Sequence, residues 1–269
     1  MSKDLMRLDG RVAVVTGAAG LLGRRHCEAL ADAGATVFAC DLSAKAAQEV
    51  AQNLGTQHVG MALDVTNDET IMELRSRLLD EHGGVDVLVN NAAMNDMVES
   101  PLSSVESSRF ENYPVKLFRR VMDVNVTGVF LMSQIIGSIM AESGKGSIIN
   151  IASTYGVVAP DQSIYRSTSG EQTFYKSAAY PTSKGAVIML TKFLATYWGH
   201  RGVRANCLSP GGVENGQSEQ FIEQYSRRTP LGRMATSTDY QAALVFLASD
   251  ASRYMTGQNL IVDGGWTAW

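Results

Sequence analysis

Residues Val12–Gly23 read VAVVTGAAGLLG and join an aliphatic run to a glycine-rich turn. Arg11–Val15 has the composition of a buried strand, and Leu21–Ala33 has helical character and ends before Gly34, a typical helix stop. Glycines between a strand and a helix let the backbone approach a pyrophosphate, which the helix N-terminus attracts. The stretch therefore predicts the first unit of an α/β fold with a candidate dinucleotide site.

The rest of the chain repeats this alternation. Repeated strand–helix units need right-handed crossovers, which place helices on both faces of a parallel sheet. We therefore predict an α/β fold with a single doubly wound parallel sheet over residues 1–269. Further strands are expected at Thr36–Cys40, His58–Leu63, Val85–Val89, Ser147–Ile151, Arg204–Ser209 and Asn259–Val262; further helices are expected from Ser43 towards Asn53, through Ile71–Leu79, and at about Lys116–Glu142, Tyr180–Trp198 and Asp239–Ser249.

Two segments interrupt the alternation, residues 154–179 and residues 212–236. Each follows a strand at the carboxyl edge of the sheet, where doubly wound folds bind ligands. We predict that 154–179 is an inserted loop near the active site and that 212–236 is a loop against substrate and cofactor.

Composition narrows the class of protein. The chain has 269 residues, 45% of them hydrophobic, with a net charge of −4 and a pI near 5.6. A basic surface for nucleic acid or anionic membrane is not expected, and we saw no apolar run near the ~18 residues that a membrane span needs. Charges at the N-terminus and three cysteines outside any CxxC favour a cytoplasmic protein. Four scattered histidines give no metal-ligand spacing, so no metal is expected.

Asp41 ends the second predicted strand, 24 positions after Gly17. A carboxylate there can accept hydrogen bonds from ribose hydroxyls and would repel a 2′-phosphate, which favours NAD over NADP. Arg24 and Arg25 could attract a phosphate, so NADP stays open. Asp41 could instead cap the next helix, a role for which Ser43 competes.

Tyr180 and Lys184 lie four positions apart in the sequence YPTSK. This spacing puts both side chains on one face of a helix. A tyrosine pKa near 10 makes a poor base, but a neighbouring ammonium favours the phenolate; a shift of ~3 pKa units corresponds to roughly 4 kcal/mol. Such a tyrosine can exchange a proton with an alcohol or carbonyl oxygen.

Together these residues resemble the compact branch of the short-chain dehydrogenase/reductases, which have a Rossmann fold. The resemblance covers about Leu8 to Gly265. Its markers stand in order: the turn Thr16–Gly23, Asp64-Val65, Asn90-Asn91-Ala92-Ala93, Asn125, Ser153, Tyr180 with Lys184, Ser209-Pro210-Gly211-Gly212, Thr256-Gly257-Gln258 and Val262-Asp263-Gly264-Gly265.

The resemblance implies roles for these positions. Tyr180 would be the general acid/base, Lys184 would lower its pKa and bind the nicotinamide ribose, and Ser153 would orient the substrate oxygen. Asn125 would hold a water that relays protons to Lys184, although it could instead bridge backbone groups in the core, and Ser153 could be a strand-end cap. The implied cofactor-binding residues are Gly17, Leu22, Asp41, Asp64, Val65, Asn91, Ala92, Tyr180, Lys184, Pro210, Gly211 and Val213.

Three departures from the family pattern qualify these expectations. Leu21 stands where the family's turn usually has its middle glycine, and the turn also fits TGxxGxxG of larger sugar-nucleotide epimerases and dehydratases. Ser153 and Tyr180 are 27 positions apart, about twice the family's usual spacing. After Gly212 the sequence Val213-Glu214-Asn215-Gly216 lacks a threonine that is common there.

The polar and aromatic insert suits a hydroxyl-rich or charged small-molecule substrate, but it could also be an exposed or subunit-contacting loop. The sequence therefore favours an NAD-dependent enzyme that interconverts a secondary alcohol and a ketone on a sugar-like or polyol substrate. An epimerase or dehydratase with bound NAD and a non-enzymatic dinucleotide binder are the alternatives. The resemblance also implies a homo-oligomer, a tetramer or dimer, and the predicted helix at 180–198 carries more apolar surface than one core face needs, at Ile188, Met189, Phe193, Leu194, Tyr197 and Trp198.

Overall fold

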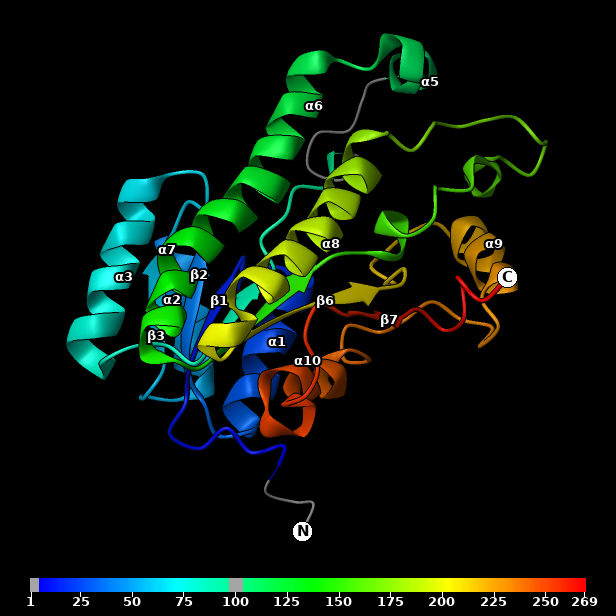
Figure 1. Cartoon of the computed structure of the whole chain (residues 1–269). Coiled ribbons are helices and arrows are strands. Elements are labelled where there is room, and N and C mark those ends of the chain that lie inside the picture. The colour runs from blue at the N-terminus through cyan, green and yellow to red at the C-terminus, as the bar shows by residue number, and fades with distance from the viewer. Residues whose placement is uncertain (1–4, 97–103) are drawn as a thin grey trace.

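A computed structural model describes residues 5–96 and 104–269. In those residues seven strands form one parallel sheet (Figure 1). They are β1 (Val12–Thr16), β2 (Thr36–Asp41), β3 (Val59–Ala62), β4 (Val87–Asn90), β5 (Gly146–Ile151), β6 (Val203–Pro210) and β7 (Asn259–Val262). The order β3-β2-β1-β4-β5-β6-β7 reverses direction between β1 and β4, which confirms the predicted doubly wound sheet.

Helices cover both faces of the sheet. α1 (Leu21–Asp32), α2 (Ala44–Leu54) and α10 (Gln241–Ala248) bury apolar side chains against one face. α3 (Asp68–His82), α7 (Gly128–Ser143) and α8 (Ala179–Trp198) bury theirs against the other. Figure 1 shows α7 and α8 crossing the sheet on the side opposite α1 and α10. The remaining helices are α5 (Val105–Ser108), α6 (Val115–Met122) and α9 (Glu219–Arg228).

Each strand contributes side chains to the cores on both faces of the sheet, because successive side chains point to opposite faces. In β1, Ala13 and Val15 belong to the core under α1, whereas Val12 and Val14 belong to the core under α7. The same alternation holds in β2, where Phe38 packs on the α3 side. Burial on both faces explains why these strands are continuous aliphatic runs in the sequence.

Two departures from the predicted elements bear on the site. The helix expected over Lys116–Glu142 is divided into α6 and α7 by a π-helical turn at Asp123–Thr127. Segment 212–236, expected as a loop, contains the helix α9. Ser218 caps α9 by accepting a hydrogen bond from the N–H of Phe221 at 3.3 Å.

The helical segment Val115–Ser143, which joins α6, the π-helical turn and α7, is long and apolar enough to cross a membrane, by length and composition only. Such a segment was not expected from the sequence. Its most apolar window has a mean hydropathy of 1.6, and 56% of that window is buried inside the molecule. Met132, Ile136 and Met140 are fully buried against the sheet. A helix that is buried in a protein core can be as long and as apolar as a membrane span. Length and composition are therefore weak evidence that this helix crosses a membrane.

Candidate active site

Two cavities lie along the carboxyl edge of the sheet. The larger, about 540 Å³, is lined by residues that follow β5 and β6, by the start of α8 and by residues from 154–179 and 212–236. The smaller, about 370 Å³, is lined by the glycine turn and by residues that end β2 or follow β3 and β4. Both are lined by Leu21, Asn91 and Ala93, so the cavities adjoin. This arrangement suits an elongated ligand with two ends.

The glycine turn is shaped for close backbone approach. Gly17 has φ +62°, and a Cβ there would lie 2.8 Å from the Cα of Ala92. A Cβ on Gly23 would overlap the carbonyl oxygen of Gly17. The amide of Asn91 donates to the carbonyl oxygens of Thr16 and Gly17 at 2.9 and 3.0 Å and holds the turn in place. Only glycine fits at both positions.

The departure at Leu21 is accommodated because the helix begins there. Gly20 is the N-cap of α1 and has an extended backbone, with φ −71° and ψ 173°. The side chain of Leu21 is partly exposed and lies where the two cavities meet. The N-terminal N–H groups of α1 therefore open on the cavities, as phosphate binding requires.

Asp41 lines the smaller cavity and is tied to the turn. Its Oδ2 accepts a hydrogen bond from the N–H of Ala19 at 2.9 Å. Ser43, not Asp41, is the N-cap of α2, since its hydroxyl accepts from the N–H of Ala46 at 3.3 Å. The carboxylate is thus held at the cavity wall, where a ribose would bind.

Arg24 and Arg25 are both engaged elsewhere. Arg24 donates from Nε to the carbonyl oxygen of Ala19 at 3.0 Å, and Arg25 forms an ion pair with Glu28 at 2.7 Å. Among the described residues, neither arginine lines either cavity. Among the described residues that line the smaller cavity, the charged ones are therefore Asp41 and Asp64.

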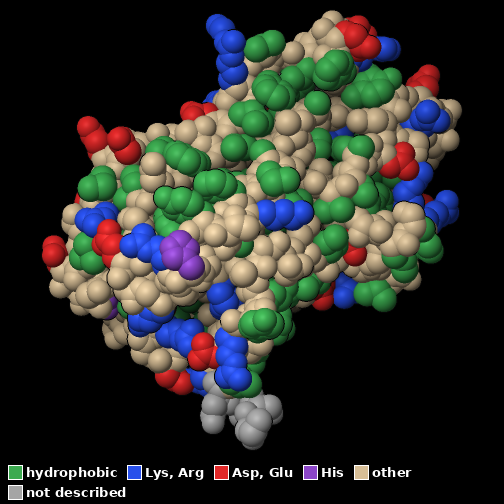
Figure 2. Space-filling model, viewed as in Figure 1, with side chains coloured by type: hydrophobic (Ala, Val, Ile, Leu, Met, Phe, Trp, Pro, Cys, Tyr) green, Lys and Arg blue, Asp and Glu red, His purple; other side chains and the backbone are tan. Residues whose placement is uncertain are grey.

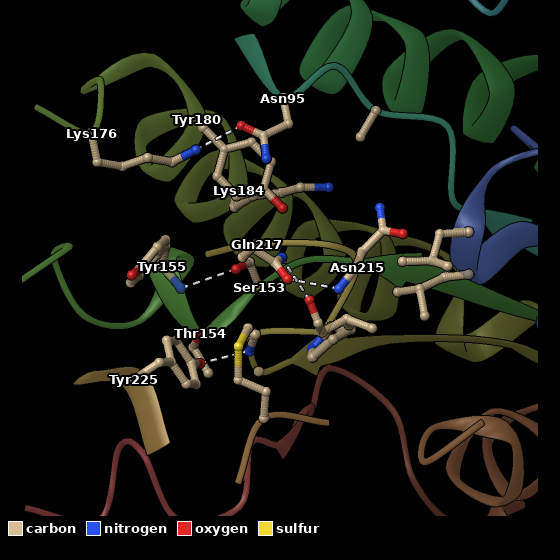
Figure 3. Close-up of a pocket in the computed structure, with 18 of the residues that line it drawn as sticks. Asn95, Ser153, Thr154, Tyr155, Lys176, Tyr180, Lys184, Asn215, Gln217 and Tyr225 are labelled. Atoms are coloured by element: carbon tan, nitrogen blue, oxygen red, sulfur yellow. Dashed lines mark hydrogen bonds between the residues drawn. The ribbon is translucent and has the colours of Figure 1, made fainter. Parts of the chain in front are cut away.

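Ser153, Tyr180 and Lys184 all line the larger cavity (Figure 3). Lys184 is buried, with Nζ 5.6 Å from the centroid of the Tyr180 ring. Its Nζ donates to the carbonyl oxygen of Ile151 at 2.7 Å. Burial lowers the pKa of Lys184 to about 8. The turn after β5 and helix α8 therefore bring the three side chains to the same cavity.

Ser153 has the capping contact that the sequence allowed, and it also lines the larger cavity. It is the N-cap of the 3-10 turn Thr154–Gly156, where its Oγ accepts from the N–H of Tyr155 at 3.1 Å. The hydroxyl faces the cavity, and its proton can still be donated to a substrate oxygen.

Asn125 lies in the π-helical turn and is fully buried. Its Oδ1 accepts from the N–H of Met94 at 2.6 Å, and its Nδ2 donates to the carbonyl oxygen of Met94 and to Ser183 Oγ. It lines neither cavity in the described part of the chain. The structure therefore places it behind α8, bridging backbone and side-chain groups in the core.

The cavity walls include every residue expected to bind the cofactor. Gly17, Asp41, Asp64, Val65, Asn91 and Ala92 line the smaller cavity; Asn91 also lines the larger one, together with Leu22, Tyr180, Lys184, Pro210, Gly211 and Val213. Because both ends of a dinucleotide would find walls in adjoining cavities, the residues present fit such a cofactor.

Segment 154–179 forms part of the cavity wall and packs on α9. Arg228 of α9 forms an ion pair with Asp161 at 2.8 Å and donates to Ser163 Oγ at 2.8 Å. Tyr165 packs on Phe174 and Phe221, with ring centroids 4.5 and 5.5 Å apart. The insert is therefore anchored over the site and is not a free surface loop.

Several cavity residues lie outside the predicted catalytic and cofactor-binding set, although most of them belong to the two segments expected at the site. Lys176 reaches the Tyr180 ring from the insert, with Nζ 5.0 Å from its centroid. Tyr225 of α9 stacks on Trp266 at 4.2 Å, and its hydroxyl accepts from the N–H of Gly212 at 2.6 Å. Other lining residues outside the predicted set are Asn95, Tyr155, Tyr165, Phe174, Asn215, Gln217 and Phe221.

Comparison with known proteins agrees with this geometry. The family model described as enoyl-(acyl carrier protein) reductase matches residues 17–267. D-threitol dehydrogenase of Mycolicibacterium smegmatis is 35% identical over 97% of this chain and 94% of its own. Galactitol 2-dehydrogenase (L-tagatose-forming) of Cereibacter sphaeroides is 33% identical over 99% of both chains.

A crystal structure of a gluconate 5-dehydrogenase from Burkholderia cenocepacia, in complex with NADP and tartrate, superposes with a TM-score of 0.83. It is 30% identical and covers 99% of this chain and 98% of its own. The sheet, the Tyr-Lys pair and these similarities lead to one assignment. The chain belongs to the short-chain dehydrogenase/reductase family.

Proposed function

We propose that this chain interconverts a secondary alcohol and a ketone on a polar, sugar-like or polyol substrate, with NAD as its cofactor. It is an oxidoreductase acting on CH–OH groups, as the relatives are. When bound, the nicotinamide accepts a hydride during oxidation and supplies it during reduction. The observation that carries the proposal is the convergence of Ser153, Tyr180 and Lys184 on the larger cavity.

Tyr180 would exchange the proton of the reacting hydroxyl. The buried ammonium of Lys184 favours the phenolate of Tyr180, because opposite charges attract strongly where little water screens them. In oxidation the phenolate accepts the hydroxyl proton, and in reduction the phenol returns a proton to the carbonyl oxygen. Ser153 would donate a hydrogen bond to the same oxygen and hold it against Tyr180.

The preference for NAD rests on Asp41. Its carboxylate is fixed at the wall of the smaller cavity by the N–H of Ala19. A 2′-phosphate would be repelled there, and the guanidinium of Arg25 is paired with Glu28. The relative crystallised with NADP makes this a point to test directly.

The substrate class rests on the wall supplied by 154–179 and 212–236. Tyr155, Asn215 and Gln217 line the larger cavity beside the catalytic side chains, as Figure 3 shows. Hydroxyl and amide groups of this kind bind the hydroxyls of a polyol through exchangeable hydrogen bonds. Threitol and galactitol, named for two relatives, are polyols.

A homo-oligomer in the cytoplasm completes the proposal. Phe130 of α7 and Met189, Phe193 and Tyr197 of α8 are 46–63% exposed, whereas Leu194 and Trp198 are buried in the protomer's own core. Figure 2 shows hydrophobic side chains spread over the face that carries these helices. An exposed apolar surface on two neighbouring helices suits contact with a second copy.

The test is an absorbance assay for reduced nicotinamide with NAD and with NADP, over polyols, sugars, sugar acids and simple secondary alcohols. The corresponding ketones are assayed in reverse. NAD-linked turnover of polyhydroxylated substrates supports the proposal. Turnover restricted to NADP overturns the cofactor assignment. Conversion of a sugar without net release of NADH indicates an epimerase or dehydratase, and NADH binding without any turnover indicates a dinucleotide binder.

A further inference from the structure

Lys176 brings a second ammonium group to the candidate active site. Its Nζ lies 5.0 Å from the centroid of the Tyr180 ring and donates to Oδ1 of Asn95 at 2.6 Å. Figure 3 shows the Lys176 side chain extended towards Asn95, beside Tyr180. All three residues line the larger cavity. The cation therefore stands next to the place where a substrate oxygen would meet the phenol.

The main chain at Lys176 is clamped, so the position of this ammonium is built into the fold. Gln162 donates from Nε2 to the carbonyl oxygen of Lys176 at 3.0 Å, and its Oε1 accepts from the N–H of Lys176 at 2.9 Å. Gln172 in turn donates from Nε2 to the carbonyl oxygens of Gln162 and Phe174 at 2.7 and 2.9 Å. Two glutamines of the insert thus hold the backbone that presents Lys176.

The described wall of the larger cavity carries two lysines. Among the described residues that line it, the charged ones are Lys176 and Lys184, and Asp and Glu are absent. Lys184 is buried beneath Tyr180 and donates to Ile151. Asp161, the acidic residue of the neighbouring turn, is paired with Arg228. Lys176 is half-buried, and its ammonium lies on the part of the cavity wall beside the Tyr180 ring.

We infer that Lys176 and Asn95 recognise a carboxylate on the substrate, so that this site prefers polyhydroxy acids to neutral polyols. The inference rests on the proposed function, because the alcohol that reacts is the one held by Ser153 and Tyr180. The carboxylate is bound and not consumed: the ammonium of Lys176 and the amide N–H of Asn95 donate to its two oxygens. The reacting carbon loses a hydride and its hydroxyl loses a proton, as in oxidation of any secondary alcohol.

The experiment compares substrates that differ in one group. D-threonate and D-threitol share their carbon skeleton, as do D-gluconate and D-glucitol, and in each pair a terminal CH2OH replaces the carboxylate. We expect Lys176→Met to lower the acid-to-polyol ratio of kcat/KM by about 10- to 100-fold, mainly through KM for the acid, because a charge-assisted hydrogen bond is lost. Lys176→Arg should restore much of the ratio, since it keeps the cation.

Two further variants sharpen the result. Arg166→Met removes a cation from the same insert, but Arg166 is exposed, its Nε donates to Gln172 Oε1, and it lies outside the described cavity wall. It should leave the ratio unchanged. Asn95→Asp keeps Lys176 and places a carboxylate against it. It should abolish the acid preference by neutralising the ammonium inside the site.

Other outcomes overturn the inference. Equal losses of kcat for acid and polyol, with a shifted pH profile, would mean that Lys176 acts on Tyr180 and not on the substrate. An unchanged ratio, or a change shared with Arg166→Met, would also exclude it.

If no substrate turns over, the proposed function fails and the carboxylate site is tested by binding. Tartrate, with NADH present, should raise the melting temperature of the parent protein and not that of Lys176→Met. Absence of the effect in the parent protein overturns the inference as well.

Discussion

Lys184 Nζ donates a hydrogen bond to the carbonyl oxygen of Ile151 at 2.7 Å. This contact ties helix α8 to the last residue of β5 and places a buried ammonium under the Tyr180 ring. The geometry has a cost, because burial disfavours the charged form and lowers the pKa of Lys184 to about 8. The buried ammonium of Lys184 is therefore a destabilising charge at neutral pH.

The unfolding free energy of the parent protein should depend on pH differently from that of Lys184→Met. The unfolded lysine has a pKa of 10.5, so between about pH 7 and pH 9.5 the unfolded chain binds more protons than the native one. The native parent protein should gain about 2 kcal/mol of unfolding free energy over this range relative to Lys184→Met. Urea unfolding of both proteins at the two pH values measures the difference. Parallel pH dependences would show that Lys184 titrates normally.

Tyr180→Phe should abolish turnover and leave cofactor binding intact. The substitution removes only the hydroxyl that exchanges the proton, so kcat should fall by about 10²–10⁴-fold. The ring, which lies between Lys176 and Lys184, is kept. Fluorescence titration with NADH should give a similar dissociation constant for both proteins. Retained turnover would remove Tyr180 from the proton-transfer role.

Asp41→Ala should weaken NAD and relax discrimination against NADP. The variant loses a carboxylate fixed by the N–H of Ala19, and with it the hydrogen bonds to a ribose and the repulsion of a 2′-phosphate. We expect KM for NAD to rise about tenfold, as for the loss of one hydrogen bond to a charged group. The ratio of kcat/KM for the two cofactors is the readout. An unchanged ratio would direct attention to Arg24.

His26 should make the protein sensitive to mild acid. The side chain is fully buried in α1, and burial lowers its pKa from 6.5 to about 4. As pH falls below 6.5 the unfolded imidazole takes up a proton and the native one does not, which favours unfolding. Between about pH 7.5 and pH 5 the native protein should lose about 2 kcal/mol relative to His26→Leu. Denaturant titrations at both values check this, and equal slopes would contradict it.

The exposed apolar surface of α8 predicts an interface between copies. Replacing Met189 and Phe193 together by glutamate should turn the proposed homo-oligomer into monomers, because buried charges without partners are costly. Tyr254→Glu is the matched control, since Tyr254 is fully exposed and distant in sequence. Light scattering after gel filtration gives the masses. An unchanged mass for the double variant would place any interface elsewhere.

The sequence predicted the sheet from local pattern, whereas most of the expected wall residues were implied by the resemblance to the short-chain dehydrogenase/reductases. Continuous aliphatic runs followed by glycine or polar residues mark buried parallel strands and their carboxyl ends, where the strand order opens a crevice. Asp41 lines the smaller cavity for that reason, whereas Leu22 and Val213, which line the larger one, were implied by the resemblance alone. Strand ends differed by only a residue or two, as at Val87–Asn90, which was expected at Val85–Val89.

The π-helical turn was not predicted, because the hydrophobic pattern of a helix does not show where its hydrogen bonds change from an i to i+4 to an i to i+5 spacing. Asn125 stands in that turn and bonds to Met94, 31 positions earlier in the chain. The fold of 154–179 was equally hidden, since it depends on contacts with α9, such as that between Asp161 and Arg228.

The amino-acid sequence by itself determined the architecture, the Tyr180–Lys184 pair and the acidic residue at the end of β2, because strand runs, helical spacing and turn glycines act over a few residues. Only the tertiary structure decided which groups surround Tyr180. Lys176 reaches the Tyr180 ring because Gln162 and Gln172 hold the backbone of the insert. Asn95, in the loop after β4, accepts a hydrogen bond from Lys176, which lies 81 positions later in the chain. Hydrogen bonds between distant segments set such a wall, and no local pattern encodes them.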